Sequence, residues 1–348
     1  MNARDMLFTM IEKNASDLHL IAGIPPSFRI DGDLSFLDKT PLSVNNLNNF
    51  LEEIVGDETK RKRFIEDREL DFAYEIKGKA RFRVNVYWQK GSAAFAIRLI
   101  PAEIPRLEDL GLPGILKDFA RKPNGLVLVT GPTGSGKSTT LAAIIDLINQ
   151  ERSLHVVTIE DPIEYVYSPK KCIISQREVG EDTNSFENAL KHVLRQDPDV
   201  ILIGEMRDLE TMQAAITAAE TGHLVFSTLH TTSASQTIDR IIDVFPPHQQ
   251  SQVRSQLSIT LQAVLTQKLL KRIDAKGRVP VTEVLVATAA VKNLIREGKS
   301  HQIYSSIELG SEYGMHTIEQ SLNELLSKKM ILWEDAKATA SMVDYMKQ

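Results

Sequence analysis

Residues 131–138 combine glycines, a lysine and a serine in an order that can hold phosphate groups. The segment reads Gly-Pro-Thr-Gly-Ser-Gly-Lys-Ser and matches the pattern G-x-x-x-x-G-K-[ST]. Glycines allow the backbone to curl so that its N–H groups point at an anion, and a helix that begins there adds the positive end of its dipole. Lys137 is expected to reach the β- and γ-phosphates of ATP, and the Ser138 hydroxyl to bind Mg²⁺. The residues predicted to contact the nucleotide are Thr133, Gly134, Ser135, Gly136, Lys137, Ser138 and Thr139.

A carboxylate, Glu205, follows the apolar run Val200–Ile203. An acid at the end of such a strand lies at the carboxyl edge of a parallel sheet, where ligands of these sheets bind. Many motor ATPases end this strand in Asp-Glu, whereas here Gly204 occupies the Asp position. Glu205 is therefore the candidate for activating the attacking water. The alternative is a solvated acid at a strand end.

Three more carboxylates, Glu160, Asp161 and Glu164, lie within five residues after another apolar run. Like charges at this density repel one another unless they share a cation. We assign Glu160 and Glu164 to the region of Mg²⁺ and the attacking water, while Asp161 precedes Pro162 and can shape the turn. A charged surface loop is the alternative.

His230 stands at the carboxyl end of the apolar run Leu224–Leu229. It is expected near the γ-phosphate, which it could contact or sense. A single histidine at a strand end also often has a structural role, and the sequence alone leaves both open.

Three arginines, Arg81, Arg83 and Arg98, lie on one face of two predicted strands. If the turn between the strands is symmetric about residues 90–91, Arg83 lies directly opposite Arg98. Directly opposed like charges are destabilising, so an anion is expected to receive them. One solution is a ring in which these arginines reach the nucleotide of the next subunit as arginine fingers in trans. The alternative is salt bridging within the small domain.

The elements that position these residues follow from apolar periodicity. Continuous apolar runs predict buried parallel strands at residues 126–130, 155–159, 200–204 and 224–229, with amphipathic helices such as 138–148 and 209–221 between them. Alternating patterns predict the two arginine-bearing strands at residues 80–88 and 93–99, and a helix is predicted at 43–55. The fold class is α/β, with a small domain at residues 1–103 and a nucleotide-binding domain at 104–348. Its core is expected at about 115–285 and C-terminal helices at about 287–348, and a Pro- and Gly-rich linker begins near Pro101.

Composition limits the function classes. The formal net charge of −5 disfavours a dedicated nucleic-acid binder, so no nucleic-acid partner is expected. The single cysteine, Cys172, predicts no thiolate zinc site and fits a reducing compartment. No apolar run approaches the roughly 20 residues that a bilayer span requires. We expect a cytoplasmic protein that can still act at a membrane through a partner.

Four segments together resemble the type II/IV secretion ATPase superfamily: GPTGSGKST, TIEDPIEYV, LRQDPDVILIGEMRD and TGHLVFSTLHT. Within it the chain is similar to the type IV pilus retraction ATPases, the PilT family. Residues 81–85, Arg-Phe-Arg-Val-Asn, resemble that family's arginine strand, and the resemblance covers nearly the whole chain.

The resemblance implies a PAS-like N-terminal domain, a RecA-like P-loop ATPase domain and a homohexamer. It implies ATP hydrolysis coupled to pilus retraction and twitching motility, and it supports the trans role of Arg83 and Arg98. The implied location is peripheral to the inner membrane at the pilus base, with a membrane platform protein as partner.

Two features bear on the subfamily. Pilus-extension and secretion ATPases usually carry four zinc-binding cysteines, which favours retraction for a chain with one cysteine. Retraction members tend to have an Ala-Ile-Arg segment where residues 290–292 read Ala-Val-Lys, and lysine cannot replace bidentate arginine contacts. An accessory retraction paralogue, working with a principal one, therefore stays open. So do an extension or secretion motor and a nucleotide-dependent scaffold with little turnover.

Overall fold

The computed structural model describes residues 3–30, 32–36, 39–100, 103–342 and 346. The chain divides into two compact units. The first comprises Met1–Glu103 with the short segment Glu164–Val166, and the second comprises Ile104–Ile163 with Tyr167–Gln348. Pro101 of the predicted linker lies outside the described residues.

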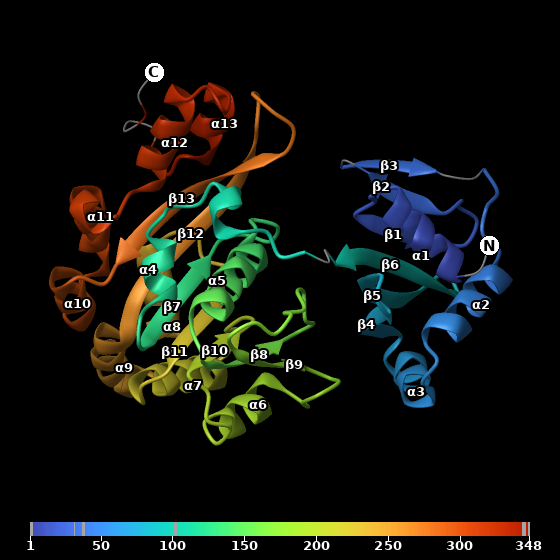
Figure 1. The fold of residues 1–348 in the computed structure, drawn as a ribbon, viewed down its shortest axis with the longest axis horizontal. Helices are drawn as coiled ribbons and strands as arrows, with labels where there is room; N and C mark the ends of the chain where they lie inside the picture. Colours follow the sequence, from blue (N-terminus) through green and yellow to red (C-terminus); the bar gives the residue numbers. More distant parts are fainter. Residues whose placement is uncertain (1–2, 31, 37–38, 101–102, 343–345, 347–348) are drawn as a thin grey trace. The chain divides into compact units, whose positions relative to one another are not determined.

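The first unit contains an antiparallel sheet of six strands in the order β3-β2-β1-β6-β5-β4 (Figure 1). Its strands are β1 (Asp17–Leu20), β2 (Ser27–Ile30), β3 (Asp33–Phe36), β4 (Glu69–Ile76), β5 (Ala80–Gln89) and β6 (Ser92–Ile100). Its helices are α1 (Ala3–Glu12), α2 (Val44–Ile54) and α3 (Glu58–Asp67). The predicted helix at residues 43–55 is confirmed, with Ser43 as its N-cap, because the Ser43 hydroxyl accepts the Asn46 N–H.

The hairpin of β5 and β6 has the predicted register. Its turn is formed by Lys90 and Gly91, which have φ values of 48° and 80°, the left-handed conformation that a two-residue hairpin turn requires. Arg83 is consequently paired directly with Arg98. The alternating apolar residues of β5 are buried, so one face of the hairpin closes the core of this unit and the arginines lie on the other.

The second unit contains a sheet of seven strands in the order β13-β12-β7-β11-β10-β8-β9. All neighbours are parallel except β12 and β13. The strands are β7 (Gly125–Thr130), β8 (His155–Glu160), β9 (Ile173–Glu178), β10 (Val200–Ile203), β11 (Leu224–Leu229), β12 (Leu261–Lys271) and β13 (Arg278–Val286). Together with the first sheet this confirms the predicted α/β class. Strands β9 and β12 were not predicted.

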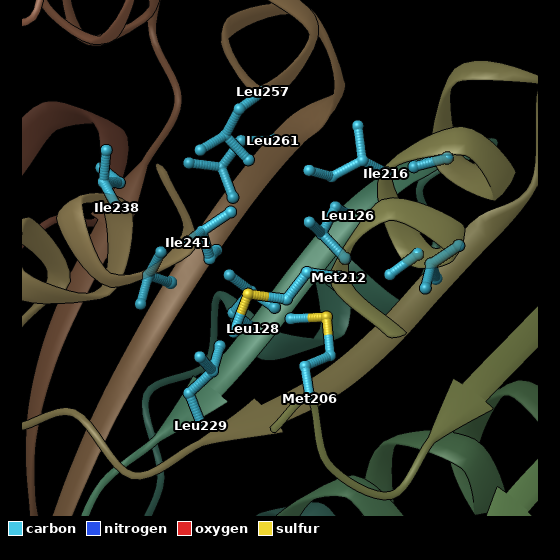
Figure 2. Packing of buried hydrophobic residues seen from close by; sticks show 14 of the residues in the cluster. Leu126, Leu128, Met206, Met212, Ile216, Leu229, Ile238, Ile241, Leu257 and Leu261 are labelled. Carbon is cyan, nitrogen blue, oxygen red and sulfur yellow. The ribbon is translucent and has the colours of Figure 1, made fainter. Parts of the chain in front are cut away.

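Apolar side chains from the strands and helices of the second unit form its largest core cluster (Figure 2). The helices that contribute are α6 (Phe186–Val193), α7 (Leu209–Glu220), α8 (Ala234–Asp243), α9 (Pro247–Thr260), α10 (Ala289–Arg296) and α11 (Ile303–Leu309). Figure 2 shows Leu126 and Leu128 of β7 facing Met212 and Ile216 of α7. Burial of this kind is worth roughly 1.5–3 kcal/mol for each large side chain, so it fixes the strand ends where the site lies.

The remaining helices flank this sheet and follow it. Helix α4 (Leu116–Ala120) precedes β7, and α5 (Lys137–Glu151) follows it and packs against it. After β13 come α10 (Ala289–Arg296), α11 (Ile303–Leu309), α12 (Ile318–Ser327) and α13 (Trp333–Thr339), as the sequence predicted in outline. Across the described ranges, no helix combines the length and the apolar character needed to cross a bilayer.

Candidate nucleotide site

Residues 131–138, here called the phosphate loop, connect the buried strand β7 to helix α5. Gly131, Gly134 and Gly136 have φ values of 139°, 77° and 88°, a region that residues with a Cβ atom rarely adopt. The loop therefore needs glycine at these positions. The first N–H groups of a helix have no intrahelical acceptor, so the start of α5 offers donors to an anion.

Lys137 lies across the phosphate loop. Its ammonium group donates to the carbonyl oxygens of Gly131, at 2.9 Å, and Pro132, at 3.1 Å. The residue is only 9% exposed. A buried ammonium held beside the loop backbone is well placed to bind a phosphate, because hydrogen bonds between two charged groups are stronger than those to neutral carbonyls.

The residues present fit a nucleotide phosphate with Mg²⁺. The Ser135 hydroxyl is buried and has no hydrogen-bond partner among the described residues, so the loop contains a polar group that a phosphate oxygen could satisfy. Ser138 is half-buried at the first turn of α5. Mg²⁺ usually takes few protein ligands and completes its shell with phosphate oxygens and water, so one hydroxyl suits it. Within the described ranges, no three His, Cys, Asp or Glu side chains gather in a way that could hold a metal.

Glu205 and His230 were predicted separately, and the structure brings them together. His230 Nε2 lies 3.4 Å from a Glu205 carboxylate oxygen, and the Glu205 side chain is 15% exposed. The ends of their strands are joined because the Thr228 hydroxyl donates to the Gly204 carbonyl at 2.7 Å. Two candidate residues thus share one end of the sheet.

Arg207 is a member of this group that the sequence analysis did not assign. Its guanidinium forms an ion pair with the Glu205 carboxylate, and this hydrogen bond raises the pKa of Arg207. The signal in the sequence was its position two residues beyond Glu205, at the same strand end. Arg207 and His230 together hold the Glu205 carboxylate between two groups that can donate hydrogen bonds.

Gly204, where many ATPases have Asp, lies close to strand β8. A Cβ atom at this position would lie 3.3 Å from the Ile159 carbonyl oxygen and 3.4 Å from the Cα atom of Glu160. These distances are at the tight end of real Cβ contacts, so a side chain at position 204 would require β8 to yield by a few tenths of an ångström. Glycine fits the close spacing of β8 and β10 without such a shift.

Glu160 ends strand β8 and is half-buried. Its carboxylate accepts hydrogen bonds from the Thr158 hydroxyl at 2.7 Å and from the Gln176 amide at 3.4 Å. Glu164 lies in the segment Glu164–Val166, which belongs to the first unit. The assignment of Glu160 and Glu164 to the Mg²⁺ region stays a prediction.

In the first unit, four charged residues lie directly opposite one another on neighbouring strands, and we call them the arginine row: Arg29, Asp17, Arg98 and Arg83. Arg98 Nε donates to Asp17 at 2.9 Å, and Arg29 lies 3.8 Å from the same carboxylate. Arg83 Nε lies 3.8 Å from Asp71. The anions that these arginines contact are therefore acids of their own unit. Arg81 is half-buried on the same strand as Arg83.

Comparisons with known proteins identify the family of this chain. A model of the type II/IV secretion system protein family matches residues 2–335. The chain is 49% identical to the type IV pilus retraction ATPase PilT of Pseudomonas aeruginosa over 98% of this chain and 99% of that protein. It is 44% identical to the type IV pilus ATPase PilU of the same organism, over 98% of this chain and 89% of that protein.

Among solved structures, the pilus retraction motor PilT with bound ADP superimposes with a TM-score of 0.92 at 47% identity, covering 99% of both chains. The ATPase DotB of Legionella pneumophila superimposes with a TM-score of 0.82 at 28% identity, covering 96% of this chain and 94% of that one. The chain thus belongs to the type II/IV secretion system protein family, and within it to the PilT family of secretion ATPases.

Proposed function

We propose that this protein hydrolyses ATP to ADP and phosphate as a motor that powers retraction of type IV pili. The observation that carries the proposal is the pairing of the phosphate loop, with Lys137 buried at its mouth, and Glu205 held at the same end of the sheet by Arg207 and His230. Two relatives are named a pilus retraction ATPase and a twitching motility protein, which supports the proposal that the motor acts on the pilus.

In this proposal each residue has a distinct task. Lys137 neutralises charge on the β- and γ-phosphates, and Ser138 contributes a ligand to Mg²⁺, which would polarise the phosphates. Glu205 orients the attacking water and accepts its proton. His230 and Arg207 hold that carboxylate in place, while Glu160 acts on the water around the metal.

We further propose that the protein works as a homohexamer in which Arg83 and Arg98 act on the nucleotide of a neighbouring subunit. Within its own unit Arg83 is held by a half-exposed ion pair, since the Arg83 and Asp71 side chains are 40% and 47% exposed. A pair of this kind is typically worth roughly 0.2–1 kcal/mol, so exchanging the Asp71 carboxylate for a nucleotide phosphate costs little. Arg98 is 68% exposed but pairs with Asp17, whose side chain is only 13% exposed and would keep Arg29 as a partner. The ring would lie on the cytoplasmic side of the inner membrane and would bind a platform protein at the pilus base, through which it acts on the pilus.

An accessory retraction motor is the second candidate. Lys292, which stands where retraction ATPases tend to have arginine, is half-buried in α10. The identity of 44% to PilU, beside 49% to PilT, supports weighing a paralogue of this kind. Complementation of strains that lack either motor distinguishes the two roles: a principal motor restores twitching in a strain lacking PilT, and an accessory one restores it only in a strain lacking PilU.

The first test is phosphate release by the purified protein and by Lys137→Ala. The exposed Lys191→Ala on α6 is the control. We expect Lys137→Ala to abolish turnover, a loss of at least about 10³-fold, because the transferred phosphate loses its positive partner. Lys191→Ala should match the wild type. Unchanged turnover in Lys137→Ala would refute the assignment of this site.

A further inference from the structure

Gln267, in the middle of strand β12, touches the phosphate loop with both its backbone and its side chain. The residue is 3% exposed. Its side-chain amide donates to the Ser135 carbonyl oxygen at 2.7 Å, and its side-chain oxygen accepts from the Thr140 hydroxyl at 2.8 Å. One buried side chain therefore ties the loop to the first turn of helix α5.

The glycines of the loop provide independent evidence for this close approach. A Cβ atom on Gly131 would lie 2.1 Å from the Gln267 carbonyl oxygen, and one on Gly136 would lie 2.8 Å from its amide nitrogen. Real Cβ atoms essentially never come this close. At Gly131 the obstacle is the backbone of β12, and at Gly136 it is the end of the Gln267 side chain. The rear of the loop is thus packed directly against residue 267.

The hydrogen bond to Ser135 has a directional consequence. A trans peptide is planar, and its C=O and N–H bonds point in opposite directions. Because the Ser135 carbonyl points at Gln267, the N–H of Gly136 must point away from β12. Backbone amides oriented in this way are what a phosphate loop uses to hold an anion.

We propose that Gln267 is a positioning residue for nucleotide binding, which fixes the Ser135–Gly136 peptide so that its amide faces the phosphates. The proposal rests on the proposed ATPase function. It adds a residue from outside the phosphate-binding motif, on a strand that is adjacent to β7 in space and distant from it in sequence. Gln267 itself touches the loop and not the nucleotide.

The test measures the affinity of a fluorescent ADP analogue for Gln267→Met, which keeps the length of the side chain and removes both hydrogen bonds. Gln262→Met is the matched control, because Gln262 lies on the same strand but packs against Gly125 at the other end of β7. We expect about tenfold weaker binding in Gln267→Met, with KM for ATP raised and kcat little changed, since two buried groups lose their partners. Gln262→Met should bind like the wild type.

Two further variants separate positioning from a general effect on folding. Gln267→Glu keeps the acceptor for Thr140 and, at a pH alkaline enough to ionise the buried carboxyl, cannot donate to Ser135, so under that condition it should weaken ADP binding at least as much as Gln267→Met. Thr140→Val keeps the bond to Ser135 and should bind ADP within about threefold of the wild type. Equal affinity in Gln267→Glu and wild type would overturn the proposal, as would an equal loss in Gln262→Met. If the wild type binds ADP but releases no phosphate, the proposed function fails while this binding test still stands.

Discussion

In the N-terminal sheet, charged side chains pair with one another at the surface, whereas around the phosphate loop the polar groups are buried and bound to backbone atoms. Arg83 and Arg98, whose side chains are 40% and 68% exposed, form ion pairs with acids of their own unit. Lys137 and Gln267 are buried and bound to carbonyl oxygens of the loop itself. The loop is thus organised by contacts within one chain, while the side chains of these two arginines remain partly exposed.

Among the changes that compare the two regions, the largest effect is expected from removing an arginine of the row. Arg83→Ala should lower ATP turnover by about 10³-fold if Arg83 acts on a neighbour's phosphates, the magnitude typical of arginine fingers. Its affinity for ADP should stay unchanged, because the phosphate loop is intact. The control is Arg63→Ala on the exposed face of α3, which should behave like the wild type.

Mixing experiments decide whether this role is in trans. When Arg83→Ala is mixed with wild type, activity should fall more steeply than the wild-type fraction, because each variant subunit disables its neighbour's site. A strictly proportional decline would remove support for the trans assignment and leave the ion pair with Asp71 as the function of Arg83.

The next largest effect is expected within the ATPase unit. Glu205→Gln should lower turnover by roughly 10²–10³-fold, since a neutral amide cannot accept the proton of the attacking water. ADP and ATP should still bind, as direct titration with a fluorescent nucleotide would show. Glu210→Gln, a similar change on the exposed start of α7, is the control. If Glu205→Gln turned over like the wild type, another acid such as Glu160 would be the base.

The last prediction concerns the free energy of unfolding and compares a buried acid, Glu283, with an exposed one, Asp71. Glu283 of β13 is 3% exposed and accepts the N–H of Ala234, at the start of α8, at 2.7 Å. Burial raises its pKa to about 7, above the usual value of 4.5; the nearby Glu319 adds to this, while the Ala234 hydrogen bond and Lys268 oppose it. The folded state therefore keeps the proton between pH 4.5 and 7 while the unfolded state loses it. Stability contributed by the protonated acid is lost as pH rises through this window, by roughly 3 kcal/mol.

Denaturant unfolding at several pH values checks this sign. In Glu283→Gln the free energy of unfolding should fall less steeply with pH than in the wild type, and the difference between the two pH curves isolates the contribution of Glu283. This difference is needed because burial lowers the pKa of His316, which makes stability rise with pH and so opposes the effect of Glu283. Asp71→Asn, whose side chain is 47% exposed, should change stability by less than about 1 kcal/mol. Parallel curves for wild type and Glu283→Gln would contradict the burial argument.

Sequence patterns predicted the parts of the fold whose signals are local. Three apolar runs predicted strands β7, β10 and β11 to within one residue at each end. These runs precede the phosphate loop, Glu205 and His230, respectively. The alternation of β5 and β6, with a two-residue turn at Lys90 and Gly91, gave the register that pairs Arg83 with Arg98.

Other parts could not be predicted because their signals come from tertiary contacts. Strand β12 begins at the residue after α9 ends, so no Gly, Pro or polar break marks it, and Gln267 was overlooked with it. Strand β9 is a half-exposed edge strand with few apolar residues. Asp17 and Asp71 pair with the arginines because their strands are neighbours in the sheet. The periodicity of a single strand does not encode which strands become neighbours.

If complete sites form only between subunits, ATP turnover per subunit must depend on protein concentration. Turnover would be measured against concentration, with molecular mass determined across the same range. We expect activity per subunit to rise as hexamers form, because Arg83 and Arg98 then reach a neighbour's nucleotide. A monomer that hydrolyses ATP as fast as any assembly would contradict the ring mechanism and leave only the nucleotide site within one chain.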